Sequence, residues 1–145
     1  MTSSAKFPNG SKAAGQVFRS TWWTLELPQG WIHQEELECI SFSNDPPLGV
    51  LRVSAARNPT GNATLQDLYD FATDFRGFKR EFQTLNSGKP VGIFAQYVEG
   101  ELFWGEWLLM SGPIVVYLTY NVLAALQGSE TMDVRRIVES TSIYS

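Results

Sequence analysis

Three apolar segments in the C-terminal half, joined by very short connections, constrain the fold more than any other feature. Residues 91–98, 102–110 and 114–120 are rich in the β-branched and aromatic side chains that favour strands. The connections, Glu99-Gly100-Glu101 and Ser111-Gly112-Pro113, are typical of β-hairpins. A parallel crossover needs a dozen or more residues. We therefore predict that the three strands form an antiparallel meander.

Three further strands are predicted in the N-terminal half. Residues 22–27 alternate as a half-buried strand does and end at the turn Pro28-Gln29-Gly30. Residues 38–43 and 50–56 follow after short connections, so we expect a second meander. Trp31, just past the turn, is expected to close one end of the sheet as a core residue.

Two helices complete the prediction. One begins after Thr64, which can cap it together with Asp67 in a capping-box arrangement. Its apolar stripe is predicted to be Leu65, Leu68, Ala72 and Phe75, with Phe78 as an optional last member. The final helix begins near Ser129-Glu130, and its inner stripe is predicted to be Val134, Ile137, Val138 and Thr141. The fold class is therefore α+β, with an antiparallel sheet of about six strands and two packed helices.

The chain length and composition predict one globular domain. Of 145 residues, 43% are hydrophobic and 18% are charged. We assign residues 1–20 to a flexible N-terminal leader and residues 21–145 to a single domain. A net charge of −4 without a run of Lys or Arg argues against a nucleic-acid partner. No apolar stretch reaches the length of a membrane span, and the N-terminus lacks the apolar core of a secretory signal. We therefore expect a cytoplasmic protein.

The order of these elements and several local motifs resemble the PsbP/DcrB-like superfamily. The motifs are "LELPQGW" at 25–31, "GVLRVSA" at 49–55 and "RRIVESTSI" at 135–143, and the similarity spans residues 20–143. The superfamily also includes the eukaryotic Ran-binding import factor Mog and bacterial chaperones for type VI secretion effectors. The resemblance implies an α/β/α sandwich and protein binding without catalysis. It does not identify a ligand, because the acidic surface pattern expected for contact with Ran cannot be matched.

Candidate catalytic groups are few. Nucleophilic catalysis would need the single histidine, His33, to meet Cys39 across a bend. We favour an exposed His33 after the turn and an inert Cys39 packed against the sheet. Glu99 and Glu101 flank a hairpin glycine and are expected to be solvated. Glu106 shares a strand face with Trp104, so it must lie at the rim of that face or meet an Arg or Lys. We predict no catalytic residue, no metal site and no cofactor.

The aromatic residues are the best candidates for binding, because two helices can hardly cover both faces of six strands. We predict that Trp104, Glu106, Tyr117 and Tyr120 border a partner-binding surface. Strand alternation puts Trp104 and Glu106 on one side, and it puts the two tyrosines on opposite sides, so that one is core.

Three functions remain open at this point. The favoured one is a non-enzymatic protein-binding module, a chaperone or immunity-type partner of a bacterial effector or toxin, acting as a monomer or homodimer. A small-molecule or lipid-binding domain is the alternative, and a hydrolase built on Glu106 or on the His33–Cys39 pair is the third. A flat aromatic patch would favour the first, a closed cavity the second, and a cleft with converging carboxylates the third.

Overall fold

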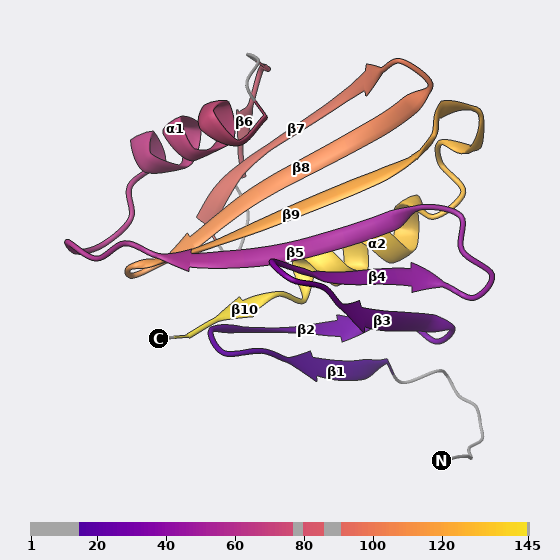
Figure 1. Cartoon of the computed structure of the whole chain (residues 1–145), viewed down its shortest axis with the longest axis horizontal. Helices are drawn as coiled ribbons and strands as arrows, with labels where there is room; N and C mark the ends of the chain where they lie inside the picture. Colours follow the sequence, from indigo (N-terminus) through magenta and orange to yellow (C-terminus); the bar gives the residue numbers. More distant parts are fainter. Residues whose placement is uncertain (1–14, 77–79, 86–90, 145) are drawn as a thin grey trace.

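The computed structural model describes residues 15–76, 80–85 and 91–144, and these residues form two antiparallel sheets and two α-helices (Figure 1). A seven-stranded sheet has the order β3-β4-β5-β9-β8-β7-β6, and a three-stranded sheet has the order β1-β2-β10. The strands are β1 (Gln16–Arg19), β2 (Trp23–Leu27), β3 (Trp31–Glu35), β4 (Ile40–Asn44), β5 (Val50–Arg57), β6 (Gln83–Thr84), β7 (Val91–Glu99), β8 (Leu102–Ser111), β9 (Ile114–Leu123) and β10 (Ser142–Ile143). The helices are α1 (Leu65–Arg76) and α2 (Thr131–Glu139).

The predicted C-terminal meander is confirmed as strands β7, β8 and β9. Glu99 pairs with Leu102 and Ser111 pairs with Ile114, so that two-residue turns close both hairpins. Gly100 and Gly112 adopt φ values of 63° and 56° in these turns. A left-handed backbone at a tight turn favours glycine, which explains both residues.

The N-terminal region differs from the prediction in three respects. Strand β1 lies within residues 1–20, so the ordered domain begins before residue 21; residues 1–14 lie outside the described residues. Residues 31–35 form a strand of their own, β3, which pairs with β4. The turn after β2 carries the chain from the small sheet into the large one, so β2 does not join the meander. The structure therefore has ten strands among its described residues rather than about six.

Helix α1 begins as predicted, at a reciprocal capping box. The Thr64 N–H donates to Asp67 Oδ2 (2.9 Å), and the Asp67 N–H donates to Thr64 Oγ1 (3.1 Å). Leu68 and Ala72 are fully buried, but Leu65 is 39% exposed, which corrects the prediction that it is core. Helical side chains lean toward the N-terminus, so the side chain of the first residue projects beyond the packed turns. The side chain of Phe75, and Phe78 altogether, lie outside the described part of the chain.

Helix α2 begins at Thr131, close to the predicted start, and buries Val134, Ile137 and Val138. Thr141 is buried as predicted, but it lies just past the end of the helix and not within its stripe. Trp31 is 5% exposed, and its indole N–H donates to Asp133 Oδ2 of α2 (2.9 Å). Trp31 therefore closes the sheet against the helix, as predicted. Neither described helix combines the length and the apolar character that crossing a membrane requires.

The large sheet has two faces, which we name after the helices. On the α1 face, Leu68 and Ala72 pack on Ile93, Leu108 and Val115. The α2 face carries the larger core, shared by α2, the small sheet and the alternate residues of the large one. Aromatic contacts join the two sheets there, since Phe18 of β1 lies edge-on to Phe42 of β4 (5.2 Å between ring centres). The small sheet thus covers the β3–β5 side, and the β7–β8 side is left to α2.

Candidate functional site

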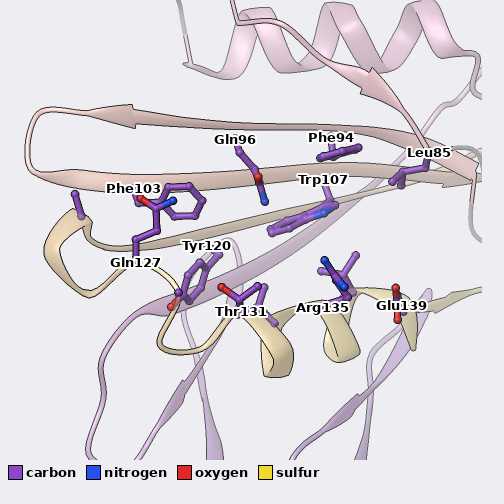
Figure 2. Close-up of a pocket in the computed structure, with 14 residues that line it drawn as sticks. Leu85, Phe94, Gln96, Phe103, Trp107, Tyr120, Gln127, Thr131, Arg135 and Glu139 are labelled. Carbon is purple, nitrogen blue, oxygen red and sulfur yellow. The ribbon is translucent and has the colours of Figure 1, made fainter.

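A groove of about 690 Å³ lies on the α2 face between α2 and strands β7 and β8 (Figure 2). Its floor is apolar and is formed by Leu85, Phe94, Phe103 and Trp107. Its rim is polar and includes Gln96, Gln127, Thr131, Arg135 and Glu139. We call this feature the groove.

The floor of the groove follows from the register of strands β7 and β8. Phe94 pairs with Trp107, and Gln96 pairs with Gly105. Directly paired residues point to the same face of a sheet, so Phe94, Gln96 and Trp107 all face α2. Phe103, two pairs further along, points the same way. The sequence alternation of these strands therefore places one aromatic row on the open face.

Gly105 determines how the Trp107 indole lies. A Cβ at Gly105 would be 2.7 Å from Trp107 Cη2 and 3.1 Å from Cζ3, far closer than ordinary van der Waals contact. The far edge of the indole therefore lies directly over the glycine backbone, in space that any other residue would fill. This pairing gives the groove a broad aromatic surface.

One stripe of α2 forms the opposite wall. Thr131, Val134, Arg135, Val138 and Glu139 line the groove at the spacing of a single helical face. Val134 and Val138 are buried, whereas Arg135 and Glu139 are exposed at the mouth. Among the described residues, the lining contains one basic and one acidic side chain and no pair of carboxylates. Its chemistry suits an apolar group with a polar border and does not provide an acid–base pair.

Tyr120 lines the inner end of the groove, and its hydroxyl is fixed by a hydrogen bond to Glu130. The Tyr120 hydroxyl donates to Glu130 Oε1 (2.6 Å), which also accepts the Gly49 N–H (3.1 Å). The Asn44 amide donates to the other oxygen of the same buried carboxylate. Burial, reinforced by the hydrogen bond to Glu130, raises the pKa of Tyr120 above its ordinary value. Tyr120 is therefore a fixed, neutral ring.

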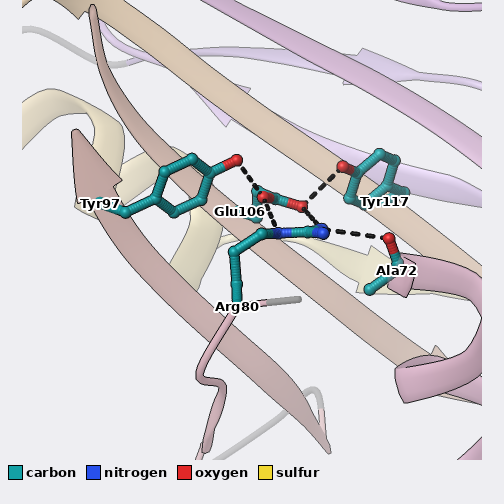
Figure 3. Close-up of polar contacts among 5 residues, drawn as sticks. All are labelled: Ala72, Arg80, Tyr97, Glu106 and Tyr117. Atoms are coloured by element: carbon teal, nitrogen blue, oxygen red, sulfur yellow. Dashed lines mark hydrogen bonds and ion pairs between the residues drawn. The ribbon is translucent and has the colours of Figure 1, made fainter. Parts of the chain in front are cut away.

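Glu106 lies on the α1 face and is the centre of a closed polar cluster (Figure 3). Arg80 donates to both of its oxygens, from Nε to Oε2 (2.8 Å) and from a terminal nitrogen to Oε1 (2.6 Å). The hydroxyls of Tyr97 and Tyr117 donate to the same carboxylate, the latter at 2.7 Å. Arg80 also donates to the carbonyl of Ala72 in α1 (3.1 Å). Of the two predicted alternatives for Glu106, a position at the rim or a basic partner, the structure shows the second, and the partner is Arg80.

The Glu106 cluster links α1 to strands β7, β8 and β9, and its carboxylate is inaccessible. Both members of the ion pair have nearly fully buried side chains, at 3% and 0% exposure. Burial and the hydrogen bond to Glu106 raise the pKa of Tyr117. A buried charge that is fully paired stabilises one arrangement of its elements, and a general acid must reach a substrate. The buried geometry of Glu106 therefore fits a structural role and not that of a general acid.

The four predicted binding residues do not share one surface. Trp104, Glu106 and Tyr117 are on the α1 face, and Tyr120 is on the α2 face. Trp104 is partly buried and stacks on Tyr97, with ring centres 6.4 Å apart. Tyr117 and Tyr120 are 3% and 5% exposed, so both are core, not one as predicted. The reason is that each face of β9 is covered, by α1 on one side and by α2 on the other.

Four residues of the groove are not predicted as site residues from the sequence: Trp107, Phe94, Phe103 and Arg135. The signal that could have indicated the first is the Gly105-x-Trp107 pair, since a glycine inside a strand marks a close approach by another group. Strand alternation across the β7–β8 hairpin also places Phe94 and Phe103 on the same face as Trp107, and this pattern can be read from the sequence. Arg135 carried no such signal, because its position depends on how α2 crosses the sheet.

His33 and Cys39 do not form a nucleophile–base arrangement. His33 is exposed and follows the Pro28-Gln29-Gly30 turn, as predicted; it lies in strand β3 and packs edge-on against Phe18 (4.8 Å between ring centres). The Cys39 thiol donates to Glu36 Oε1 (3.6 Å). Burial and the nearby Glu36 carboxylate raise the pKa of the thiol, which disfavours the reactive thiolate. In the described ranges, no three His, Cys, Asp or Glu side chains gather as metal ligands would.

Comparison with known proteins identifies the fold through structure rather than sequence. No protein-family model matches the chain, and no curated protein is significantly similar to it. A crystal structure from Bacteroides thetaiotaomicron matches with a TM-score of 0.70 and 18% identity; the match covers 92% of this chain and 50% of that one. Cyanobacterial PsbP (CyanoP) from Synechocystis sp. PCC 6803 matches with a TM-score of 0.63 and 15% identity over 97% and 98% of the two chains.

Two structures of Mog1 belong to the same group. A point mutant of Mog1 matches with a TM-score of 0.60 and 11% identity, over 92% of this chain and 97% of that one. The Ran-binding protein Mog1p of Saccharomyces cerevisiae matches with a TM-score of 0.56 and 12% identity, over 83% and 89%. At these low sequence identities, the similarity establishes a shared fold. The chain has the α+β fold shared by PsbP and Mog1.

Proposed function

We propose that this protein is a non-enzymatic binding module whose groove takes up an apolar segment of a protein partner. One observation carries the proposal: the aromatic floor, with the Trp107 indole lying over Gly105, is only partly buried and lines an open groove at the margin of the core. Large aromatic side chains in a partly open site are the usual anchors of protein–protein contacts. Its polar rim supplies the hydrogen-bonding border that such contacts need.

The proposed class of partner rests on the similarity of this chain to proteins that bind other proteins. Mog1p, which shares the fold, is described as a Ran-binding protein. The sequence resemblance to chaperones of type VI effectors favours a bacterial effector or toxin as the partner of this chain. We propose that it acts in the cytoplasm as a chaperone or immunity-type partner, as a monomer or homodimer.

A second candidate function is small-molecule or lipid binding. The concave shape and the volume of about 690 Å³ favour it, since that volume lies within the range of small-molecule sites. The groove is neither the flat patch expected for the first function nor the closed cavity expected for the second, so binding experiments must separate them.

The test uses a phage-displayed library of random dodecapeptides, selected on the full chain. We expect selected peptides to bind wild type and to bind Trp107→Ala at least about thirtyfold more weakly, since loss of a central aromatic anchor costs about 2 kcal/mol or more. Fluorescence anisotropy of labelled peptides gives the dissociation constants.

Trp104→Ala is the matched control, because it removes an indole from the opposite face of the same strand. We expect it to change peptide affinity by less than about twofold. If Trp104→Ala weakens binding and Trp107→Ala does not, then the site lies on the α1 face and includes Trp104, as the sequence predicts. If no peptide is selected, and the apolar dye anilinonaphthalene sulfonate binds wild type but not Trp107→Ala, the small-molecule function is favoured.

A further inference from the structure

Strand β7 has an open edge beside the groove. Its outer neighbour, β6, is only two residues long and pairs with Ile93 and Phe94. Strand β7 continues for five residues beyond Phe94, to Glu99, and Figure 1 shows it extending well past β6. The second half of β7 is therefore the outer strand of the large sheet among the described residues.

The outward backbone groups of this edge belong to Gln96 and Val98. The Leu85 N–H donates to the Gly92 carbonyl across the β6–β7 ladder, so the backbone of Gly92 points outward. Backbone groups alternate in direction along a strand, so those of Phe94, Gln96 and Val98 point outward too. Within the described ranges, no hydrogen bond reaches the outward N–H and C=O groups of Gln96 and Val98. These groups form a template for one more strand.

The edge and the groove are continuous. Gln96 lines the groove, and its neighbour on the same face, Val98, is 57% exposed. A strand added along Gln96–Val98 would present every second side chain on the α2 face, at the open side of the groove. Main-chain donors and acceptors that have no partner among the described residues, beside an apolar groove, suit an extended peptide better than a lipid or a small molecule.

The charges beside the edge indicate what kind of peptide fits. Exposed Glu81 precedes β6, and exposed Glu101 lies in the turn that ends β7. A twofold pairing of two copies would bring both pairs of these carboxylates to one short seam, between chains that each carry a net charge of −4. The seam would span three residues, which is short for the interface that a stable dimer needs. A basic segment of another protein is therefore favoured over a second copy.

We propose that the partner segment docks as an added β-strand on Gln96–Val98, with apolar side chains facing the groove and Lys or Arg at its ends. This inference rests on the proposed function, because it names how the segment bound by the groove is held. Main-chain pairing supplies affinity, and the groove selects the side chains.

Val98 offers a sharp test. Its N–H points away from β8, so Val98→Pro removes the edge donor without removing a bond of the β7–β8 ladder. The matched control, Val98→Thr, keeps the donor and changes the side chain by a similar amount. For the library peptides whose binding depends on Trp107, we expect Val98→Pro to weaken binding about tenfold and Val98→Thr less than about twofold. Amide hydrogen exchange at Gln96 and Val98 should slow in wild type when the peptide saturates it.

The outcomes separate this inference from the proposed function. Equal peptide affinities for Val98→Pro and Val98→Thr, or unchanged amide exchange at Gln96 and Val98, would overturn strand addition. The proposed function of the groove would still stand in that case, provided that peptide binding depends on Trp107. Selected peptides rich in Asp or Glu would overturn the charge assignment. If thermal melts show that Val98→Pro is unfolded, a selected peptide that is N-methylated at every second residue is tested on wild type instead. N-methylation removes main-chain donors, so strand addition requires this peptide to bind at least about tenfold more weakly than the unmodified one. A selection that yields no Trp107-dependent peptide overturns both proposals.

Discussion

The two faces of strands β8 and β9 carry similar residues with different surroundings. On the α1 face, Tyr117 donates to buried Glu106, and on the α2 face, Tyr120 donates to buried Glu130. Glu106 is paired with Arg80, whereas the groups that donate to Glu130 are neutral. The α1 face is sealed over its glutamate, but an open groove lies beside Tyr120. The covering elements, not the strand sequence, decide which face is open.

Removing Glu106 should have the largest effect on stability. Glu106→Ala leaves the Arg80 guanidinium buried without its partner, so we expect a loss of about 3–5 kcal/mol in the free energy of unfolding. Glu130→Ala strands only neutral donors and should cost about 1–3 kcal/mol. Urea denaturation of both variants measures the difference, and equal losses would show that the charge of Arg80 does not distinguish the two faces.

Alkaline pH should destabilise the protein through both tyrosines. The folded-state pKa values of Tyr117 and Tyr120 are raised, while an unfolded tyrosine titrates near pH 10. Their contribution is thus fully present below about pH 10, and it is lost above that pH, where only the unfolded chain ionises. The free energy of unfolding should fall by about 1.4 kcal/mol per pH unit for each tyrosine.

Urea midpoints between pH 9 and pH 12 test this expectation, provided that unfolding stays reversible. Tyr117→Phe and Tyr120→Phe should each reduce the alkaline slope by about one proton. A slope that neither substitution changes would mean that other groups cause the alkaline loss.

Gly105→Ala should alter the groove more than the fold. The new Cβ would meet the far end of the Trp107 ring, which can swing aside, so we expect a stability loss of only about 1 kcal/mol. Displacement of the indole should nevertheless weaken peptide binding severalfold and shift the tryptophan emission. An unchanged affinity would contradict the role of Trp107 as the floor of the groove.

His33→Gln should have the smallest effect. His33 is exposed on β3 and touches Phe18 through one ring edge, so we expect a change below about 0.5 kcal/mol. Peptide binding should be unaltered, since the histidine does not line the groove. Thermal melts and anisotropy check both. A loss of binding with intact folding would show that the site extends beyond the groove to the small-sheet side.

Local sequence patterns determined most of the secondary structure. The hairpins of β7, β8 and β9 follow from strand composition and two-residue turns, and the start of α1 follows from Thr64 and Asp67. These features depend on residues a few positions apart, and such interactions are encoded locally. Strand alternation likewise fixed that Trp104 and Glu106 share a face and that Tyr117 and Tyr120 do not.

Only the tertiary structure decided which faces are covered and where the groove lies. The sequence contains nothing that assigns β2 to a separate sheet, brings Arg80 to Glu106 across 26 positions, or sets α2 beside Trp107. These arrangements depend on how elements far apart in the chain divide a limited apolar surface between them. Alternation tells which side chains share a face, but burial depends on what packs against that face. For this reason the sequence predicted aromatic binding residues in β8 and β9, whereas only the fold shows that the groove lies beside Trp107 and that Trp104 stacks on Tyr97.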